Sequence, residues 1–138
     1  MHKVVTQWKG NMAFESTLPD GVIKIDVPED KGGDGNGMRP KALMLTSLAG
    51  CSGLDVASLI KKMRLEVDDF RIETDGDLTD EDPQTYHTVT VRYIFSGKNL
   101  NEEKLTKAVN LSVEKYCGVM KMFESFAKMV IDIQFDHQ

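Results

Sequence analysis

The two cysteines are the residues of this sequence best suited to carry out chemistry. Cys51 lies in the segment LAGCS at residues 48–52, and Cys117 lies in EKYCG at residues 114–118. Each segment contains a glycine, whose missing side chain leaves room beside the sulfur for an approaching molecule. Two thiols within disulfide reach can be oxidised and reduced reversibly, whereas a cysteine is also an ordinary small residue of a protein core. The residue types alone leave both interpretations open.

Other polar groups are weaker candidates for a functional site. The three histidines are separated from one another and from the cysteines, so no zinc site is expected from His2, His87 and His137. The acidic segment 77–82 lacks the ordered alternation of a calcium loop. The glycine-rich segment 32–37 is not followed by the Gly-Lys-Ser/Thr of a phosphate-binding loop. We therefore expect neither a metal ion nor a cofactor.

The composition predicts one globular domain over residues 1–138. Hydrophobic residues make up 41% and charged residues 28% of the chain, with a net charge of −5, close to the averages for globular proteins. The scattered basic residues argue against nucleic-acid binding, and the first residues lack the apolar core of a signal peptide. The apolar stretch 42–60 is interrupted by polar residues and glycines. We expect a cytoplasmic protein that binds small molecules or a second copy of itself, and no membrane.

Alternating apolar residues and turn signals predict six strands. They are expected at residues 4–8, 13–16, 22–27, 70–75, 88–95 and 129–135. The first three should form an antiparallel meander, and the next two a long hairpin. Residues 28–37 are rich in glycine and nearly free of apolar side chains, which predicts a flexible loop.

Helical periodicity predicts two main helices. The first begins at Pro40 and runs to residue 63, and because it is apolar on nearly every face we expect it to be buried on all sides. The second begins after Asn101 and reaches Cys117, where Gly118 should act as a left-handed cap or a kink, with further helical turns over 119–127. The sum is an α+β fold in which antiparallel sheets pack around two central helices.

The segments around both cysteines resemble motifs of the OsmC/Ohr family. Residues 38–52, MRPKALMLTSLAGCS, are similar to the family's helix entry, where a proline and a Leu/Ala-rich stretch precede a cysteine. Residues 113–119, VEKYCGV, resemble its second cysteine motif, and the order and spacing match over essentially the whole chain. The resemblance implies an OsmC-like, intertwined α+β homodimer with two helices at its centre and active sites at the subunit interface.

The resemblance also implies a chemical role for both cysteines. In the family's peroxidase branches, the cysteine matching Cys51 attacks a peroxide as a thiolate and becomes a sulfenic acid. The cysteine matching Cys117 then condenses with it to a disulfide, which an external dithiol reduces. The expected function is a thiol-dependent peroxidase that reduces organic hydroperoxides or hydrogen peroxide in oxidative-stress defence.

The charged residues around the first motif differ from the family pattern. The organic-hydroperoxide branch typically carries an arginine in its first strand-turn and a glutamate just after the helix-opening proline. This chain has no arginine before Arg39, and Lys41 occupies the place of the glutamate. Arg39 or Lys41 could supply the positive charge that favours the Cys51 thiolate, and Glu114 could orient a cation. Alternatively, all three are solvated surface charges.

The sequence therefore leaves two further functions open beside the peroxidase. One is a non-catalytic OsmC-like protein that binds a small apolar ligand or senses oxidants, and the other is a fold with inert core cysteines. For the peroxidase we expect the two thiols within disulfide reach and Cys51 reacting faster than Cys117. We also expect an obligate homodimer that buries more than about 2,000 Å².

Overall fold

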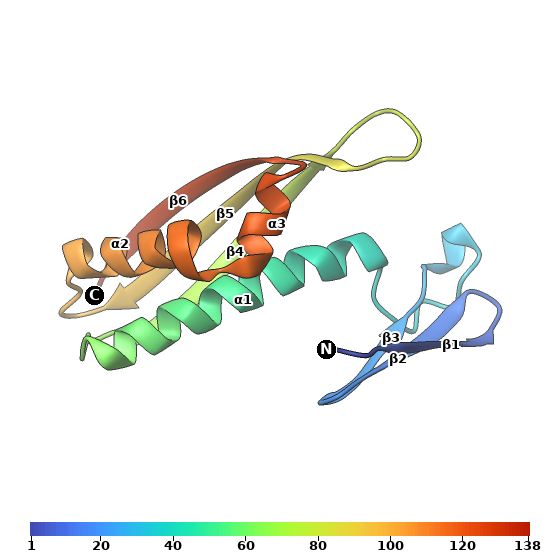
Figure 1. The fold of residues 1–138 in the computed structure, drawn as a ribbon, viewed down its shortest axis with the longest axis horizontal. Helices are drawn as coiled ribbons and strands as arrows, with labels where there is room; N and C mark the ends of the chain where they lie inside the picture. The colour runs from blue at the N-terminus through green and yellow to red at the C-terminus, as the bar shows by residue number, and fades with distance from the viewer. The chain divides into compact units, whose positions relative to one another are not determined.

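The computed structural model describes residues 1–138 and divides them into two compact units. The first unit is Met1–Met44 and the second is Leu45–Gln138. Each unit has its own three-stranded sheet, and one long helix, α1 (Pro40–Lys62), begins in the first unit and continues into the second (Figure 1). The α+β class expected from the sequence is confirmed.

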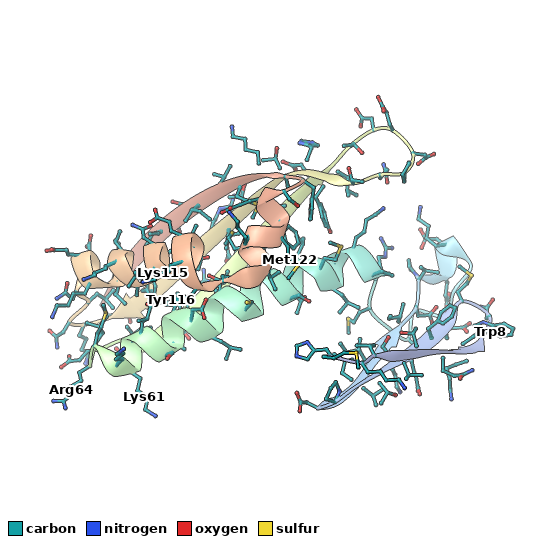
Figure 2. All side chains as sticks on the ribbon, in the orientation of Figure 1. Trp8, Lys61, Arg64, Lys115, Tyr116 and Met122 are labelled. Carbon is teal, nitrogen blue, oxygen red and sulfur yellow. The ribbon has the colours of Figure 1, made fainter.

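The first unit contains the predicted antiparallel meander. Its strands are β1 (Val5–Gly10), β2 (Ala13–Leu18) and β3 (Gly21–Ile25), paired in that order. The β1–β2 turn places Gly10 at φ 101° and Asn11 at φ 47°, a left-handed region that glycine and asparagine tolerate better than other residues. Trp8, labelled in Figure 2, is 60% exposed on this sheet.

The glycine-rich segment after β3 is folded around a buried carboxylate, so the expectation of a flexible loop is wrong. Asp26 accepts hydrogen bonds from the backbone N–H groups of Val27 at 2.7 Å, Asn36 at 3.2 Å and Asp34 at 3.4 Å. The bond from Val27 is the largest cause that lowers the pKa of Asp26. A Cβ atom on Gly33 would lie 2.0 Å from the Val27 carbonyl oxygen. Glycine is therefore needed here for close packing.

The second unit contains a mixed sheet. Its strands are β4 (Asp69–Leu78), β5 (Tyr86–Gly97) and β6 (Lys128–His137), with β5 in the middle. The antiparallel β4–β5 hairpin is confirmed, but β6 pairs with β5 in parallel, so the expectation of antiparallel strands throughout is wrong. The helical connection between β5 and β6 brings the chain back to the start of β5, and such a crossover makes the pair parallel.

The connection from β5 to β6 contains two helices separated by a wider turn. Asn101 caps α2 (Glu102–Leu111) by accepting the Lys104 N–H at 3.0 Å, as the sequence predicts. A π-helical turn follows at Ser112–Tyr116, and α3 occupies Gly118–Glu124. Helices α2 and α3 and the second-unit part of α1 lie on the same face of the sheet (Figure 1).

The core of the second unit lies between that sheet face and the helices. Its fully buried apolar side chains come from the central strand and from each helix: Val89, Val91, Tyr93, Phe95, Leu48, Val56, Leu105, Val109 and Met120. Strand β5 contributes the most because it is flanked on both edges and covered by helices. This core fixes the two helical segments that carry the cysteines.

Helix α1 is buried along one narrow stripe, so the expectation of burial on all sides is not met within the chain. Its buried residues are Leu48, Ser52 and Val56, four residues apart, which places them on one helix face. Leu54 is 74% exposed. By length and composition α1 could cross a membrane, a test that the mostly buried core helices of soluble proteins also pass. Within this chain, 17% of its apolar window is buried.

Candidate active site

Cys51 lies in the middle of α1 at the edge of its buried stripe. Its neighbour Ser52 and Leu48, one turn earlier, are fully buried against the core, so the helix holds the Cys51 backbone in place. The Cys51 side chain itself is half-buried. A Cβ atom on Gly50 would meet no atom within 4 Å. Within the chain, there is therefore open space beside Gly50, the residue that precedes Cys51.

Cys117 occupies the junction between the π-helical turn and α3. Its backbone is extended, with φ −80° and ψ 103°, and its N–H donates to the Ser112 carbonyl at 2.8 Å. Its sulfur accepts the Met120 N–H at 3.3 Å and so caps α3. Gly118 is helical and begins α3, so the expectation of a left-handed cap at Gly118 is wrong. The helix breaks at Cys117 itself.

The Cys51 side chain lies near enough to the Cys117 thiol to raise its pKa, which fits the expectation that the two thiols are close together. Burial raises the pKa of Cys117 to about 11, the Met120 N–H opposes the rise, and Cys51 and the Asp55 carboxylate add to it. Cys117 is only 3% exposed. At neutral pH it is therefore a protonated thiol.

A chain of buried hydroxyl groups lies next to the cysteines in both helical segments. Ser52 Oγ is 2.6 Å from the Tyr93 hydroxyl and 2.8 Å from Ser112 Oγ. Ser112 Oγ in turn donates to Asp55 Oδ2 at 2.9 Å. Ser52, Tyr93 and Ser112 are fully buried, and burial raises the pKa of Tyr93 to about 12, so its hydroxyl stays protonated.

Sequence reasoning missed this hydroxyl chain, although a signal was present. Ser52 and Asp55 are three residues apart in the otherwise apolar α1, and Ser112 falls on the apolar stripe of the following helix. A polar residue on a buried helix face needs a hydrogen-bond partner. Polar side chains on the buried faces of two helices therefore predict a shared buried network.

The three charged candidates have no shown contact with the thiols. Lys41 is ten positions before Cys51 in the sequence of α1 and belongs to the first unit. Arg39 belongs to the first unit, and its carbonyl accepts the Leu43 N–H at 3.1 Å. Glu114 is exposed on the π-helical turn. Their roles in catalysis stay predictions.

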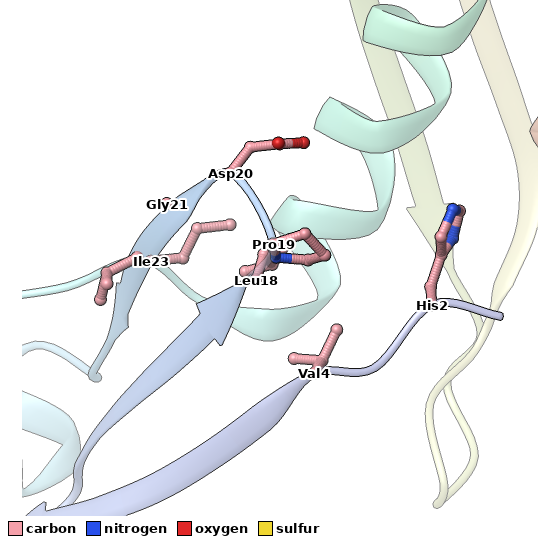
Figure 3. A pocket seen from close by; sticks show the side chains of 8 residues that line it. His2, Val4, Leu18, Pro19, Asp20, Gly21 and Ile23 are labelled. Atoms are coloured by element: carbon pink, nitrogen blue, oxygen red, sulfur yellow. The ribbon is translucent and has the colours of Figure 1, made fainter.

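A surface hollow of about 410 Å³ lies in the first unit, away from both cysteines in the sequence. Val4, Leu18, Pro19 and Ile23 provide its apolar lining, and His2 and Asp20 its ionisable groups (Figure 3). No hydrogen bond or ion pair joins His2 and Asp20, so the hollow contains no pair of ionisable groups arranged to act together. We place the candidate active site at the thiol pair instead. No group of three or more His, Cys, Asp or Glu residues could hold a metal ion.

Comparison with known proteins places these observations in a family. The family model OsmC, described as OsmC-like protein, matches residues 33–132. Protein YhfA of Escherichia coli strain K12 is 33% identical over 85 residues, which cover 62% of this chain and 63% of YhfA. The match thus spans less than two thirds of that relative's length.

Solved structures share the fold over nearly the whole chain. A hypothetical protein from Aquifex aeolicus VF5 has a TM-score of 0.88 at 29% identity, covering 100% of this chain and 98% of that one. The organic hydroperoxide resistance protein OhrB of Bacillus subtilis has a TM-score of 0.64 at 23% identity, covering 96% and 97%. This second likeness shows the fold alone. Because the family model spans most of the sequence and includes both cysteine segments, the chain belongs to the OsmC-like protein family.

Proposed function

We propose that this OsmC-like chain is a two-cysteine thiol peroxidase that reduces organic hydroperoxides or hydrogen peroxide. The observation that carries the proposal is that the two cysteines are neighbours: Cys51 packs against the core cluster that contains Cys117 and raises the pKa of its thiol. Two neighbouring cysteines of this kind need only a small movement to close a disulfide. Fold relatives named for organic hydroperoxide resistance, such as OhrB of Bacillus subtilis, also support it.

Cys51 is the attacking sulfur in the proposed cycle, because Cys117 is buried and keeps its proton at neutral pH. The Cys51 thiolate attacks one peroxide oxygen, the O–O bond breaks, and the alcohol or water leaves with a proton from solvent. Cys51 is then a sulfenic acid. The Cys117 sulfur attacks it, an S–S bond forms, and the hydroxyl leaves as water with the Cys117 proton. An external dithiol reduces this disulfide to two thiols and is itself oxidised.

The proposal includes a homodimer that acts in the cytoplasm, with each chain as a single OsmC-like domain. Large apolar side chains remain exposed in both units, among them Trp8 at 60% and Leu54 at 74%. Exposed apolar surface of this kind is typical of interaction sites. A second copy that covers the exposed side of α1 supplies the burial that one chain lacks.

The test is peroxide turnover with dithiothreitol as the external dithiol. Purified protein should consume tert-butyl hydroperoxide or hydrogen peroxide well above the uncatalysed rate. Cys51→Ser should abolish this consumption, and without dithiothreitol Cys117→Ser should consume only about one equivalent and keep Cys51 as a sulfenic acid. Ser125→Ala, which removes an exposed hydroxyl bonded only to the Met122 carbonyl, should turn over like the wild type. No consumption of either peroxide would overturn the proposal.

One observation favours the alternative of a non-catalytic ligand-binding or redox-sensing protein. Asp55 follows Cys51 by four residues on α1, a spacing that places two side chains on the same helix face. The Asp55 carboxylate adds to the raised pKa of Cys117 and so disfavours a thiolate at Cys117, whereas a peroxidase cycle needs a thiolate at the cysteine pair. A redox sensor would form the Cys51–Cys117 disulfide with about one equivalent of peroxide, and reduction of that disulfide by dithiothreitol would be too slow to sustain turnover in the same assay.

A further inference from the structure

We infer that Ser112 is a positioning residue that holds Cys117 against Cys51, through the buried chain of hydroxyl groups that ends on Asp55. The inference rests on the proposed function in one respect, because it takes the cysteine pair to be redox-active. It adds a role for four residues that the cycle itself does not use: Ser52, Asp55, Tyr93 and Ser112.

Ser112 is bonded to both of the segments that carry the cysteines. Its backbone carbonyl accepts the Cys117 N–H at 2.8 Å, five residues later, and this bond closes the π-helical turn. Its hydroxyl lies 2.8 Å from Ser52 Oγ and 2.9 Å from Asp55 Oδ2, both on α1. One residue thus ties the Cys117 turn to the helix that holds Cys51.

The chemistry of the Asp55 carboxylate and the three buried hydroxyl groups fixes the direction of each hydrogen bond between them. An ionised carboxylate only accepts, so Ser112 donates to Asp55. Ser52 then donates to Ser112, and the protonated Tyr93 hydroxyl donates to Ser52. The buried hydroxyl groups of Ser52, Tyr93 and Ser112 therefore each have a hydrogen-bond partner. Apolar contacts alone would not set the rotation of the turn in this way, because hydrogen bonds are directional and dispersion contacts are not.

The π-helical turn explains why such a tie is needed. A π-turn interrupts the regular α-helical hydrogen bonding and is a rare local structure, often found at functional sites. Here it lets the chain leave α2 and place Cys117 in an extended conformation at the start of α3. Without the hydrogen bonds from Ser112 to α1, the π-helical turn has more conformational freedom in the reduced protein. Forming the disulfide then costs more conformational entropy than in the wild type, so the disulfide becomes less favourable.

The experiment measures the equilibrium constant of the Cys51–Cys117 disulfide in mixtures of oxidised and reduced dithiothreitol. In this exchange, Cys51 and Cys117 each lose a hydrogen and form one S–S bond, while the S–S bond of oxidised dithiothreitol is reduced to two thiols. Ser112→Ala should lower the constant at least about tenfold, the factor expected for a single hydrogen bond to a charged group. Ser125→Ala is the matched control and should leave the constant unchanged. A constant in Ser112→Ala within about twofold of the wild type would overturn the inference.

A second pair of variants separates positioning from loss of stability. Asp55→Asn keeps an oxygen acceptor for the Ser112 hydroxyl but loses the charge and should lower the constant only slightly, whereas Asp55→Ala removes the side-chain acceptor as well and should lower it severalfold. If Ser112→Ala does not fold, the two Asp55 variants still test the inference, because Asp55 is only half-buried and its replacement disturbs the core less. Equal constants in the Asp55 variants would then contradict the inference. Urea unfolding of the reduced variants shows whether stability changes in parallel.

The measurement does not use peroxide, so it separates this inference from the proposed function. If the wild type forms the disulfide with dithiothreitol but does not consume peroxide, the peroxidase fails while the positioning role stands. If the wild type consumes peroxide and Ser112→Ala has an unchanged constant, the positioning role fails while the peroxidase stands.

Discussion

Replacing the buried Cys117 with serine should remove a pH-dependent part of the free energy of unfolding. Burial is the largest cause that raises the pKa of Cys117 from 9.0 to about 11, with further contributions from Cys51 and Asp55 against the opposing Met120 N–H. The folded protein therefore favours the neutral thiol more strongly than the unfolded chain does. Serine has no ionisation in this range and does not contribute such a dependence.

The sign and size of the effect follow from these two pKa values. The stabilising contribution is fully present below pH 9, where both states hold the proton, and it is lost as pH rises through 11. A difference of two pKa units corresponds to about 2 to 3 kcal/mol. The wild type should lose this much stability relative to Cys117→Ser between those pH values.

Urea unfolding of fully reduced protein, followed by circular dichroism across this pH range, measures the difference. Tyr93, whose pKa burial raises to about 12, is present in both proteins, and Cys117 contributes less to this pKa than burial does, so most of the Tyr93 titration cancels. The quantity to compare is the wild-type free energy of unfolding minus that of Cys117→Ser at each pH. A difference that stays constant within about 0.5 kcal/mol would refute the reasoning, because it would mean that Cys117 ionises equally in both states.

Three further outcomes are expected. At pH 7, iodoacetamide should modify Cys51 at least about tenfold faster than Cys117, because Cys117 is buried and protonated; equal rates by peptide mass spectrometry would contradict this. Light scattering should show a wild-type dimer that Leu54→Asp weakens, since Leu54 is 74% exposed on α1; a wild-type monomer would exclude the proposed interface. Gly33→Ala should lower the free energy of unfolding by about 1 to 3 kcal/mol in urea, because its Cβ would lie 2.0 Å from the Val27 carbonyl oxygen. An unchanged free energy of unfolding would contradict this, because it would mean that the backbone can move to accept the methyl group.

Local patterns in the sequence predicted most of the secondary structure. The alternation in β4 and β5, the cap at Asn101 and the proline at the start of α1 each act over a few residues, so sequence alone reveals them. The parallel direction of β6 depends on the crossover that precedes it, which no alternation within the strand encodes. The order around Asp26 was missed because a carboxylate that binds backbone N–H groups can hold a glycine-rich segment without apolar burial.

The candidate site was predicted in part. The cysteines were found because thiols are rare in this chain and because their surroundings resemble a family motif. The break at Cys117 was assigned to Gly118, since a glycine is the usual residue for ending a helix. The break lies at Cys117, and the preceding turn is bonded to α1 by Ser112, which joins residues 60 positions apart in the sequence. Polar residues on buried helix faces indicate that such a contact exists, but its partners are set by tertiary packing.

The most direct test of the Cys51–Cys117 redox pair is the intact mass of the reduced protein after one equivalent of tert-butyl hydroperoxide. Formation of the disulfide should lower the mass by about 2 Da and remove both free thiols, and a protease digest should contain the Cys51 and Cys117 peptides joined together. An unchanged mass with both thiols still free, or a stable gain of oxygen on either cysteine without a disulfide, would contradict the account.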